Sequence, residues 1–323
     1  MTDSLESLRS AILAYGDRFG DTHVLPLVIA LTLHIASLLV RSGVWCGILR
    51  AAFPDREVKY RDATGAYLVG AGANGIAPLR GGDLVRLYTI RRALPGVSHA
   101  TVISTLIAET AFGAVVVAAM AVATVALGWL PPLVRLPDSR AFEFSFYAAH
   151  WAVVASILVV AALITVLTAE WIGHHLAGLS RRIWQGLWIV RSPGRFARVV
   201  AIPQLFDWTL RVATAYALLA AFGLPAALRL ALLVVVIDSV STALPFTPGG
   251  VGAQQGLLVF ALGGAATSSQ VLAFSIGSQA VILALNLVLG MAAAFMVFGH
   301  IRLDSLHRDA HRWAGRQSST QKG

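Results

Sequence analysis

The stretch NGIAPLRGGDLVRLYTIRR, residues 74–92, breaks an apolar run with a proline, a glycine pair and several arginines. The chain around it is strongly apolar: 57% of its 323 residues are hydrophobic, 13% are charged, and the mean hydropathy is +0.74. Several apolar runs reach the roughly 20 residues that a helix needs to cross the hydrocarbon core of a bilayer. The composition therefore predicts an all-α polytopic membrane protein, and the quoted break bears on how many segments cross.

Apolar segments of two lengths alternate with basic loops. The segments long enough to span are 24–44, 100–129, 144–169, 200–222 and 269–298. Two others, 63–79 and 229–246, are shorter and end in Pro/Gly-rich breaks. If these two enter the membrane and turn back, most of the 25 basic residues lie on the cytoplasmic side, whereas seven full spans give no bias. The positive-inside rule therefore favours five spans and two re-entrant helical hairpins, with the N-terminus outside and the C-terminus cytoplasmic.

The remaining segments are assigned around a transmembrane domain at 24–299. Residues 1–23 are expected to be an uncleaved N-terminal extramembrane segment, because they are acidic where a signal peptide is basic. The loop 170–198 has the spacing of an amphipathic interfacial helix, and 300–323 is a basic cytoplasmic tail that begins as a short helix. The net charge of +9 resides in loops and reports topology, so no nucleic-acid partner is predicted. The single cysteine, Cys46, excludes an internal disulfide and a thiolate metal cluster, and no cofactor is expected.

The two breaks share a pattern. PLRGG at residues 78–82 and PFTPGG at residues 245–250 both place proline shortly before a glycine pair. In the five-span topology one segment enters from the cytoplasm and the other from outside, which is the pattern of an inverted repeat around a midplane site. The similarity is short, so the alternative is that two independent Pro/Gly breaks coincide.

Each break is expected to start a new helix. Asp83 can cap the first helix, and Thr247 with Pro248 can begin the second. Unpaired amides at a helix start, approached closely through glycine, favour an anionic group such as phosphate. Arg80 and Arg86 add planar guanidinium donors that suit phosphate oxygens. The alternative for Arg86 is an ion pair with Asp83 at i,i+3.

Four charged residues lie deep within apolar segments. An unpaired charge there costs at least about 2.5 to 3.5 kcal/mol. Asp207 and Arg211 have i,i+4 spacing, which predicts an intramembrane ion pair. Glu109 and Asp238 have no opposite charge nearby in the sequence, so they are predicted to face a polar cavity. Polar residues that could line the same cavity, or serve instead as helix-packing contacts, are Asn74, Gln255, Gln279 and Asn286.

Three parts of this sequence together resemble the membrane domain of the lysylphosphatidylglycerol synthase/flippase family: residues 74–86, Glu109, and LPFTPGGVG at residues 244–252. The resemblance implies a helical domain of the bacterial inner membrane that handles lipids, in some members moving aminoacylated or polyprenyl-linked lipids between leaflets. The sequence departs from the family pattern where Thr110, not arginine, follows Glu109. It departs again at Gln255, where the family usually has glutamate, so charge coupling at that position is in question. The soluble domain that aminoacylates lipid is missing, so that reaction is not expected.

The resulting hypothesis is a lipid translocase or lipid-binding transporter that holds an anionic headgroup (phospholipid, aminoacyl-lipid or polyprenyl-linked) in a midplane cavity. The residues predicted to contact the headgroup are Asn74, Arg80, Gly81, Gly82, Asp83, Arg86, Glu109, Asp238, Pro248, Gly249, Gly250, Gly252 and Gln255. The expected partners are anionic membrane lipids, and a glycine run in 65–75 also allows a homo-oligomer. The alternative function is a non-transporting scaffold for a lipid- or glycan-modifying enzyme. The chain itself is not predicted to be an enzyme, because no catalytic constellation is visible unless distant residues assemble one.

Overall fold

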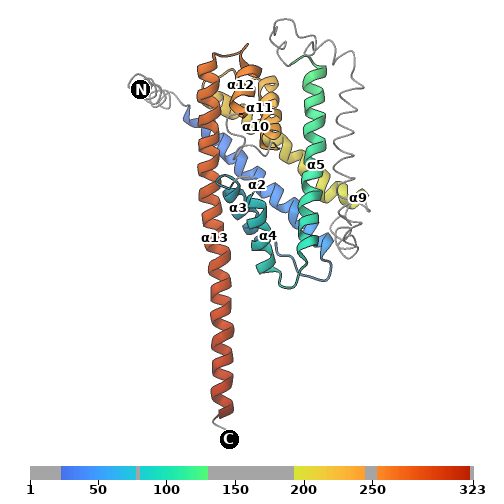
Figure 1. The fold of residues 1–323 in the computed structure, drawn as a ribbon, viewed down its shortest axis with the longest axis vertical. Helices are drawn as coiled ribbons and strands as arrows, with labels where there is room; N and C mark the ends of the chain where they lie inside the picture. The colour runs from blue at the N-terminus through green and yellow to red at the C-terminus, as the bar shows by residue number, and fades with distance from the viewer. Residues whose placement is uncertain (1–22, 78–80, 130–192, 244–252, 321–323) are drawn as a thin grey trace, which may run out of the picture.

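The computed structural model describes residues 23–77, 81–129, 193–243 and 253–320, and the regular elements within these ranges are all helices (Figure 1). The first four are α2 (Val24–Ala52), α3 (Tyr60–Asn74), α4 (Gly81–Ala93) and α5 (His99–Ala126). The later ones are α9 (Pro193–Phe196), the π-helical η3 (Ala197–Ala201), α10 (Ile202–Ala221), α11 (Leu228–Ala243), α12 (Ala253–Leu262) and α13 (Ser268–Thr320).

Among the described residues, three helices are long and apolar enough to cross a membrane: α2, α5 and the Ser268–Val297 part of α13. They coincide with the predicted spans 24–44, 100–129 and 269–298, so the prediction of a helical membrane protein is confirmed. Helix α10 occupies the position predicted for 200–222, but its polar residues lower its hydropathy below that of the other three. The predicted span 144–169 and the interfacial helix 170–198 lie outside the described residues, apart from the last few positions of the latter. Five spans and two re-entrant hairpins therefore stay predictions.

Helix α2 runs antiparallel to the continuous helix formed by α9, η3 and α10. At one end the His23 amide, just before α2, donates to the Ala221 carbonyl at the end of α10 over 2.9 Å. At the other end of α2, Gly47 faces Val199 of η3, and Val200 packs into a small apolar cluster with Ile48. Both helices cross the molecule obliquely between α13 and α5 (Figure 1). This antiparallel pair is the centre around which the shorter helices pack.

Glycine allows the short helix α3 to pack closely on two neighbours. A Cβ added at Gly70 would lie 2.8 Å from the Arg86 Cβ and 2.9 Å from the Gly82 carbonyl oxygen, both in α4. A Cβ added at Gly72 would lie 2.9 Å from the Asn286 carbonyl oxygen and 3.1 Å from the Gly290 Cα, both in α13. Small residues at such crossings are the usual means of bringing helix backbones together in membranes. The glycine run in 65–75 thus has partners within the chain.

The same order of long, short, short and long helices occurs twice: α2 to α5, then α10 to α13. The packing contacts of the first set have counterparts in the second: α2 with α3 and α10 with α11, α3 with α4 and α11 with α12, α4 with α5 and α12 with α13. The contact between α3 and α13 corresponds to that between α11 and α5. The largest apolar core joins α10 to α13, and the second joins α2 to the start of α5. The two sets therefore share one arrangement of contacts.

The last helix extends far beyond the others. The sequence predicts a short helix at the start of the tail 300–323, whereas α13 continues without a break from Ser268 to Thr320. Its 53 residues correspond to a length of about 80 Å. The C-terminal part projects away from the bundle (Figure 1).

We expect Gly72→Ala to lower the free energy of unfolding by about 1 to 3 kcal/mol, because the added methyl group would collide with the backbone of α13. The matched control is Gly256→Ala in α12, where an added Cβ meets no atom within 4 Å. That change should leave stability unchanged or raise it slightly, since alanine restricts the unfolded chain. Thermal unfolding in detergent measures both variants. Equal unfolding midpoints would contradict the close crossing of α3 and α13.

Candidate functional site

Arg86 of α4 is enclosed by the three helices that precede or follow α4 in the chain. Its Nη2 atom donates to Oε2 of Glu109 over 2.6 Å, and the two side chains are only 7% and 9% exposed. Its Cζ atom lies 3.7 Å from the ring centroid of Trp45 in α2 and 4.2 Å from that of Tyr67 in α3. A desolvated cation over an aromatic face gains about 2 kcal/mol or more. The opposite charge that Glu109 lacks locally thus comes from Arg86 of α4.

The start of α4 explains how Arg86 reaches this position. The Asn74 side chain, at the end of α3, accepts a hydrogen bond from the Gly82 amide at 2.9 Å. The helix begins at Gly81, so Asp83 lies within its first turn, where the sequence had predicted a cap. With Gly70 opposite, the first turn of α4 lies directly against α3. The Gly82 amide, predicted to face a ligand, is therefore bonded to Asn74 in this structure.

A second group of charges joins α2 to α10. Asp207 is 4% exposed, and its Oδ2 atom lies 3.1 Å from Nε of Arg211 and 3.9 Å from Nε of Arg41. The Ser37 hydroxyl donates to the other carboxylate oxygen. The structure thus contains the i,i+4 pair of Asp207 with Arg211, and α2 adds two further partners. Arg41 also lies 5.4 Å from the ring centroid of Tyr67, the same ring that contacts Arg86 on the other side of the site.

We call these five ionisable side chains the charge cluster: Arg41, Arg86, Glu109, Asp207 and Arg211. Two further carboxyl groups act on these guanidinium groups, since Asp238 interacts electrostatically with Arg211 and Arg41, and Asp83 with Arg41. In a low-dielectric environment such charges are costly unless each is compensated. The charge cluster therefore consists of guanidinium groups compensated by carboxyl groups, and a guanidinium group is a donor that suits phosphate oxygens.

A chain of hydrogen bonds, formed mainly by side-chain amides, joins α11, α12 and α13. The Gln255 side chain donates to Oε1 of Gln279 over 2.8 Å, and Gln279 donates to the side chain of Gln254. Gln254 in turn hydrogen-bonds the carboxyl group of Asp238. Two residues predicted to share a cavity, Asp238 and Gln255, are thus connected through two glutamines. We call these four residues the glutamine chain.

The Arg86–Glu109 pair and the glutamine chain occupy matching places in the two sets of helices. Arg86 and Gln254 each stand four residues after a glycine pair. Their partners, Glu109 and Gln279, lie at nearly the same distance from the start of the next long helix. Arg86 bonds Glu109 as Gln254 bonds Gln279. One set therefore has an ion pair where the other has an amide pair.

Sequence reasoning missed several residues of the site. Arg41 could have been identified from the sequence as a site residue, because arginine is rare inside an apolar helix. Trp45 and Tyr67 give no signal, since buried aromatic residues usually pack in the core. Gln204 of α10 donates to the Glu109 carbonyl oxygen at 3.3 Å, which only the packing of α5 on α10 reveals. Predicted site residues outside the described part of the chain are Arg80, Pro248, Gly249, Gly250 and Gly252.

Two further observations complete the site. His34 of α2 and Asn286 of α13 are joined by a hydrogen bond of 2.9 Å between Nε2 and Oδ1. Within the described ranges, no three His, Cys, Asp or Glu side chains lie close enough to hold a metal ion. The polar groups of this region are thus ion pairs, amides and hydroxyl groups.

The chain was compared with the profiles of known protein families. The profile of the family described as "Lysylphosphatidylglycerol synthase TM region" matches residues 8–290. The matched range includes the charge cluster, the glutamine chain and both Pro/Gly breaks. A comparison with curated proteins found no match.

We expect Glu109→Ala to destabilise the protein by about 3 to 5 kcal/mol, because it leaves Arg86 buried without a carboxylate. The double variant Arg86→Met with Glu109→Gln should lose less than the sum of the single losses, since it removes both charges. Arg61→Ala is the control, because Arg61 pairs with Asp62 at 3.7 Å while 70% exposed, and an exposed pair contributes about 1 kcal/mol or less. Chemical unfolding in mixed micelles measures these three variants together with the single variants Arg86→Met and Glu109→Gln. Additive losses would mean that Arg86 and Glu109 do not interact.

Proposed function

Because the chain belongs to the lysylphosphatidylglycerol synthase transmembrane-region family, we propose that it is a lipid translocase or lipid-binding transporter whose charge cluster receives an anionic headgroup. The family makes this a lipid-related membrane domain. The observation that carries the proposal is the group of three guanidinium side chains between helices of a membrane domain, with the Nε atom of Arg86 buried and without a hydrogen-bond partner among the described residues. Ionisable groups inside membrane domains are costly, and they commonly mark substrate or ion pathways.

Arg86 has the capacity to hold a further anion. A guanidinium has five N–H donors in a planar fork that matches phosphate oxygens. In this structure its Nε atom is buried without a hydrogen-bond partner among the described residues. The aromatic rings of Trp45 and Tyr67 fix the plane of the fork. A headgroup phosphate could therefore bond Arg86 without a change in the orientation of its side chain.

Glu109 has the role of a resident competitor in this proposal. In the absence of substrate its carboxylate neutralises Arg86, which avoids an unpaired buried charge. A headgroup phosphate would displace it, and the carboxylate would return when the headgroup leaves. This exchange limits the affinity for the lipid, which a translocase needs because tight binding would stop release.

The matched contacts of the two helix sets support an inverted repeat. Since α2 and α10 are antiparallel, a two-fold axis that exchanges them is perpendicular to both, and so lies near the membrane plane. The 15 residues of α3 and the 16 of α11 correspond to about 22 to 24 Å, short of a core of about 30 Å. We infer that α3 with α4 and α11 with α12 are opposed re-entrant hairpins in a five-span protein of the inner membrane, with the C-terminus cytoplasmic. The site would lie between them, with no catalytic step.

The two halves would then hold a headgroup differently. In the first half Arg86 binds it by charge, whereas α11, α12 and α13 of the second half offer the amide hydrogen bonds of the glutamine chain and the Asp238 carboxyl group. The headgroup would be bound more tightly at Arg86 than at the glutamine chain. Its release would therefore be faster from the glutamine chain.

The second candidate is a non-transporting scaffold for a lipid- or glycan-modifying enzyme. It is favoured by the projection of α13, which extends well past the bundle and gives a partner a long helical surface (Figure 1). In that case the charge cluster would serve stability alone.

We expect opposite effects of two neutral substitutions on co-purified lipid. Glu109→Gln frees Arg86 and should raise the ratio of retained phosphatidylglycerol to phosphatidylethanolamine, by about tenfold if 1.4 kcal/mol of competition is removed. Arg86→Gln should lower the ratio to the level of bulk lipid. Native mass spectrometry of gently purified protein measures the ratio, with Arg61→Gln as the exposed control that should match wild type.

Transport itself is measured with fluorescent phosphatidylglycerol in reconstituted vesicles. Arg86→Gln should slow its movement between leaflets because binding is lost. Glu109→Gln should also slow it, because the competitor that promotes release is absent. Folding of each variant is checked by its unfolding midpoint. If wild-type protein, Glu109→Gln and Arg86→Gln retained and moved the lipid equally, the scaffold would be the better assignment.

A further inference from the structure

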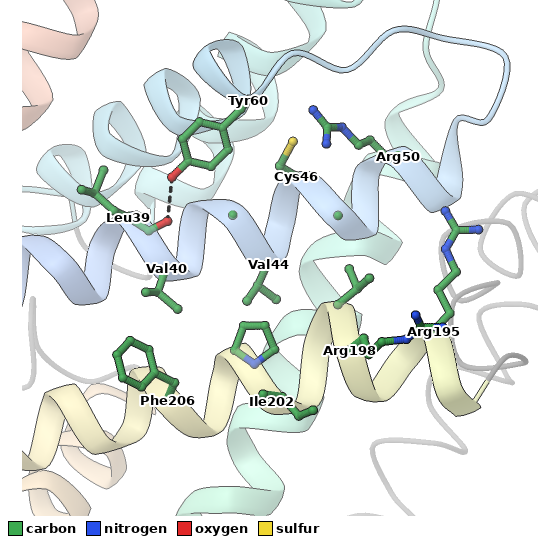
Figure 2. Close-up of a pocket in the computed structure, with 14 residues that line it drawn as sticks. Leu39, Val40, Val44, Cys46, Arg50, Tyr60, Arg195, Arg198, Ile202 and Phe206 are labelled. Carbon is green, nitrogen blue, oxygen red and sulfur yellow. Dashed lines mark hydrogen bonds between the residues drawn. The ribbon is translucent and has the colours of Figure 1, made fainter.

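A groove of about 820 Å³ follows the antiparallel pair of α2 with η3 and α10, and none of the sequence-predicted site residues lines it. Figure 2 shows Val40 and Val44 of α2 directed toward α10, where Ile202 and Phe206 form the opposite side. Ile202 is 60% exposed and Phe206 is 55% exposed. The greater part of the groove is thus apolar and open at the surface.

Three arginines stand at one end of this groove: Arg50 near the end of α2, Arg195 of α9 and Arg198 of η3 (Figure 2). All three are exposed, and none forms an ion pair with another residue that the structure describes. A second hollow of about 340 Å³ adjoins the first and shares Arg50 and Arg195. It includes Asp55 and Arg56, so basic residues still predominate there.

Two of the arginines are held by the backbone through the Nε atom. Arg50 donates from Nε to the Val58 carbonyl at 2.9 Å, and Arg198 donates from Nε to the Gly194 carbonyl at 3.3 Å. No other described group accepts a hydrogen bond from their terminal nitrogens. Those nitrogens are the pair that binds phosphate in a bidentate way. The fixed stem and unbonded terminal atoms leave less side-chain entropy to lose on binding.

The π-helical segment η3 shapes the same end of the groove. Its wider turn carries Arg198 and Val199, and Gly47 of α2 faces Val199 so closely that a side chain there would collide with it. Single π-helical turns inside α-helices are rare and are frequently found at functional sites. Here the interruption lies where the arginines meet the apolar part of the groove.

We propose that this groove is a binding seat for one anionic phospholipid, with the phosphate between Arg50, Arg195 and Arg198 and one acyl chain along Val40, Val44, Ile202 and Phe206. Charge complementarity selects an anionic headgroup, and the apolar length of the groove would be unused by a free phosphate ion. The arginines lie at the end that the predicted topology places at the cytoplasmic leaflet, whose lipids are anionic.

The inner end of the groove lies beside the charge cluster. Leu39 and Val40 directly precede Arg41, and Phe206 directly precedes Asp207, so groove and cluster occupy adjacent faces of the same two helices. A lipid in the seat would therefore lie next to the cluster before its headgroup enters. This role in loading substrate rests on the proposed function, whereas binding in the groove does not.

The test uses phosphatidylglycerol with a photoreactive diazirine in one acyl chain, added to the full chain in nanodiscs of phosphatidylcholine. Mass spectrometry of the cross-linked protein should place adducts on groove residues in preference to Phe295, an 80% exposed residue of α13 outside the groove. Substituting Arg50, Arg195 and Arg198 with glutamine should lower groove labelling by about fivefold for each arginine removed. Arg61→Gln should leave it unchanged.

A second variant blocks the apolar part without altering charge. Gly43 lines the groove, and a Cβ there makes an ordinary contact of 3.5 Å with Tyr60, so Gly43→Leu should fold and fill the space. It should lower acyl-chain labelling while a phosphatidylcholine probe stays at its low wild-type level. Inorganic phosphate in millimolar excess should not compete.

Four results would overturn the seat. Equal labelling of Phe295 and the groove would mean an unspecific lipid shell. Competition by inorganic phosphate would mean a simple anion site, and unchanged labelling in Gly43→Leu would exclude the groove. A disulfide between a cysteine at Val40, in a Cys46→Ser background, and one introduced in 144–169 would show that this segment fills it. If the groove does not bind the lipid, Glu109→Gln and Arg86→Gln are still expected to change the ratio of retained lipids in opposite directions. The seat and the proposed function are therefore tested separately.

Discussion

The enclosed ion pair of Arg86 with Glu109 is the contact on which the N-terminal half depends. It brings together four helices, because α4 and α5 supply the charges while Trp45 of α2 and Tyr67 of α3 cover the guanidinium. In an apolar surrounding neither charge can be left alone, so the helices must pack in the one arrangement that satisfies both. The glycine contact of α3 with α4 then follows, since only a residue without a side chain lets Arg86 approach.

Polar contacts, more than apolar ones, specify how these helices pair. Lipid tails solvate leucine as well as protein does, so apolar faces give little preference for one neighbour over another. Between α2 and α10 the choice is made by Asp207 with Arg211, Arg41 and Ser37. Between α12 and α13 it is made by amides. The same groups that fix the packing are those proposed to meet the headgroup, so stability and function are coupled in this protein.

The difference between the two halves gives the molecule a direction. Their helices share one contact arrangement, yet an ion pair stands in one half where an amide pair stands in the other. Gln255 bonds Gln279 and so belongs to the amide contacts of the second half. A symmetric frame with unequal polar contents can hold the same headgroup with two affinities. The arginines of the groove add a further difference between the two halves, since they occupy only one end of the α2 and α10 pair.

The sequence by itself determined the helical membrane class, the position of each described span, the Asp207 and Arg211 pair and the family. These depend on local patterns: length of apolar runs, i,i+4 spacing and short motifs. Only the tertiary structure decided that Glu109 pairs with Arg86, that Asn74 caps α4 and that Gln254 and Gln279 connect Asp238 to Gln255. Those partners lie on different helices, and in a bilayer apolar periodicity says little about which helix is next to which. Charge pairing and glycine contacts across helices settle that question, and they exist only in the folded arrangement.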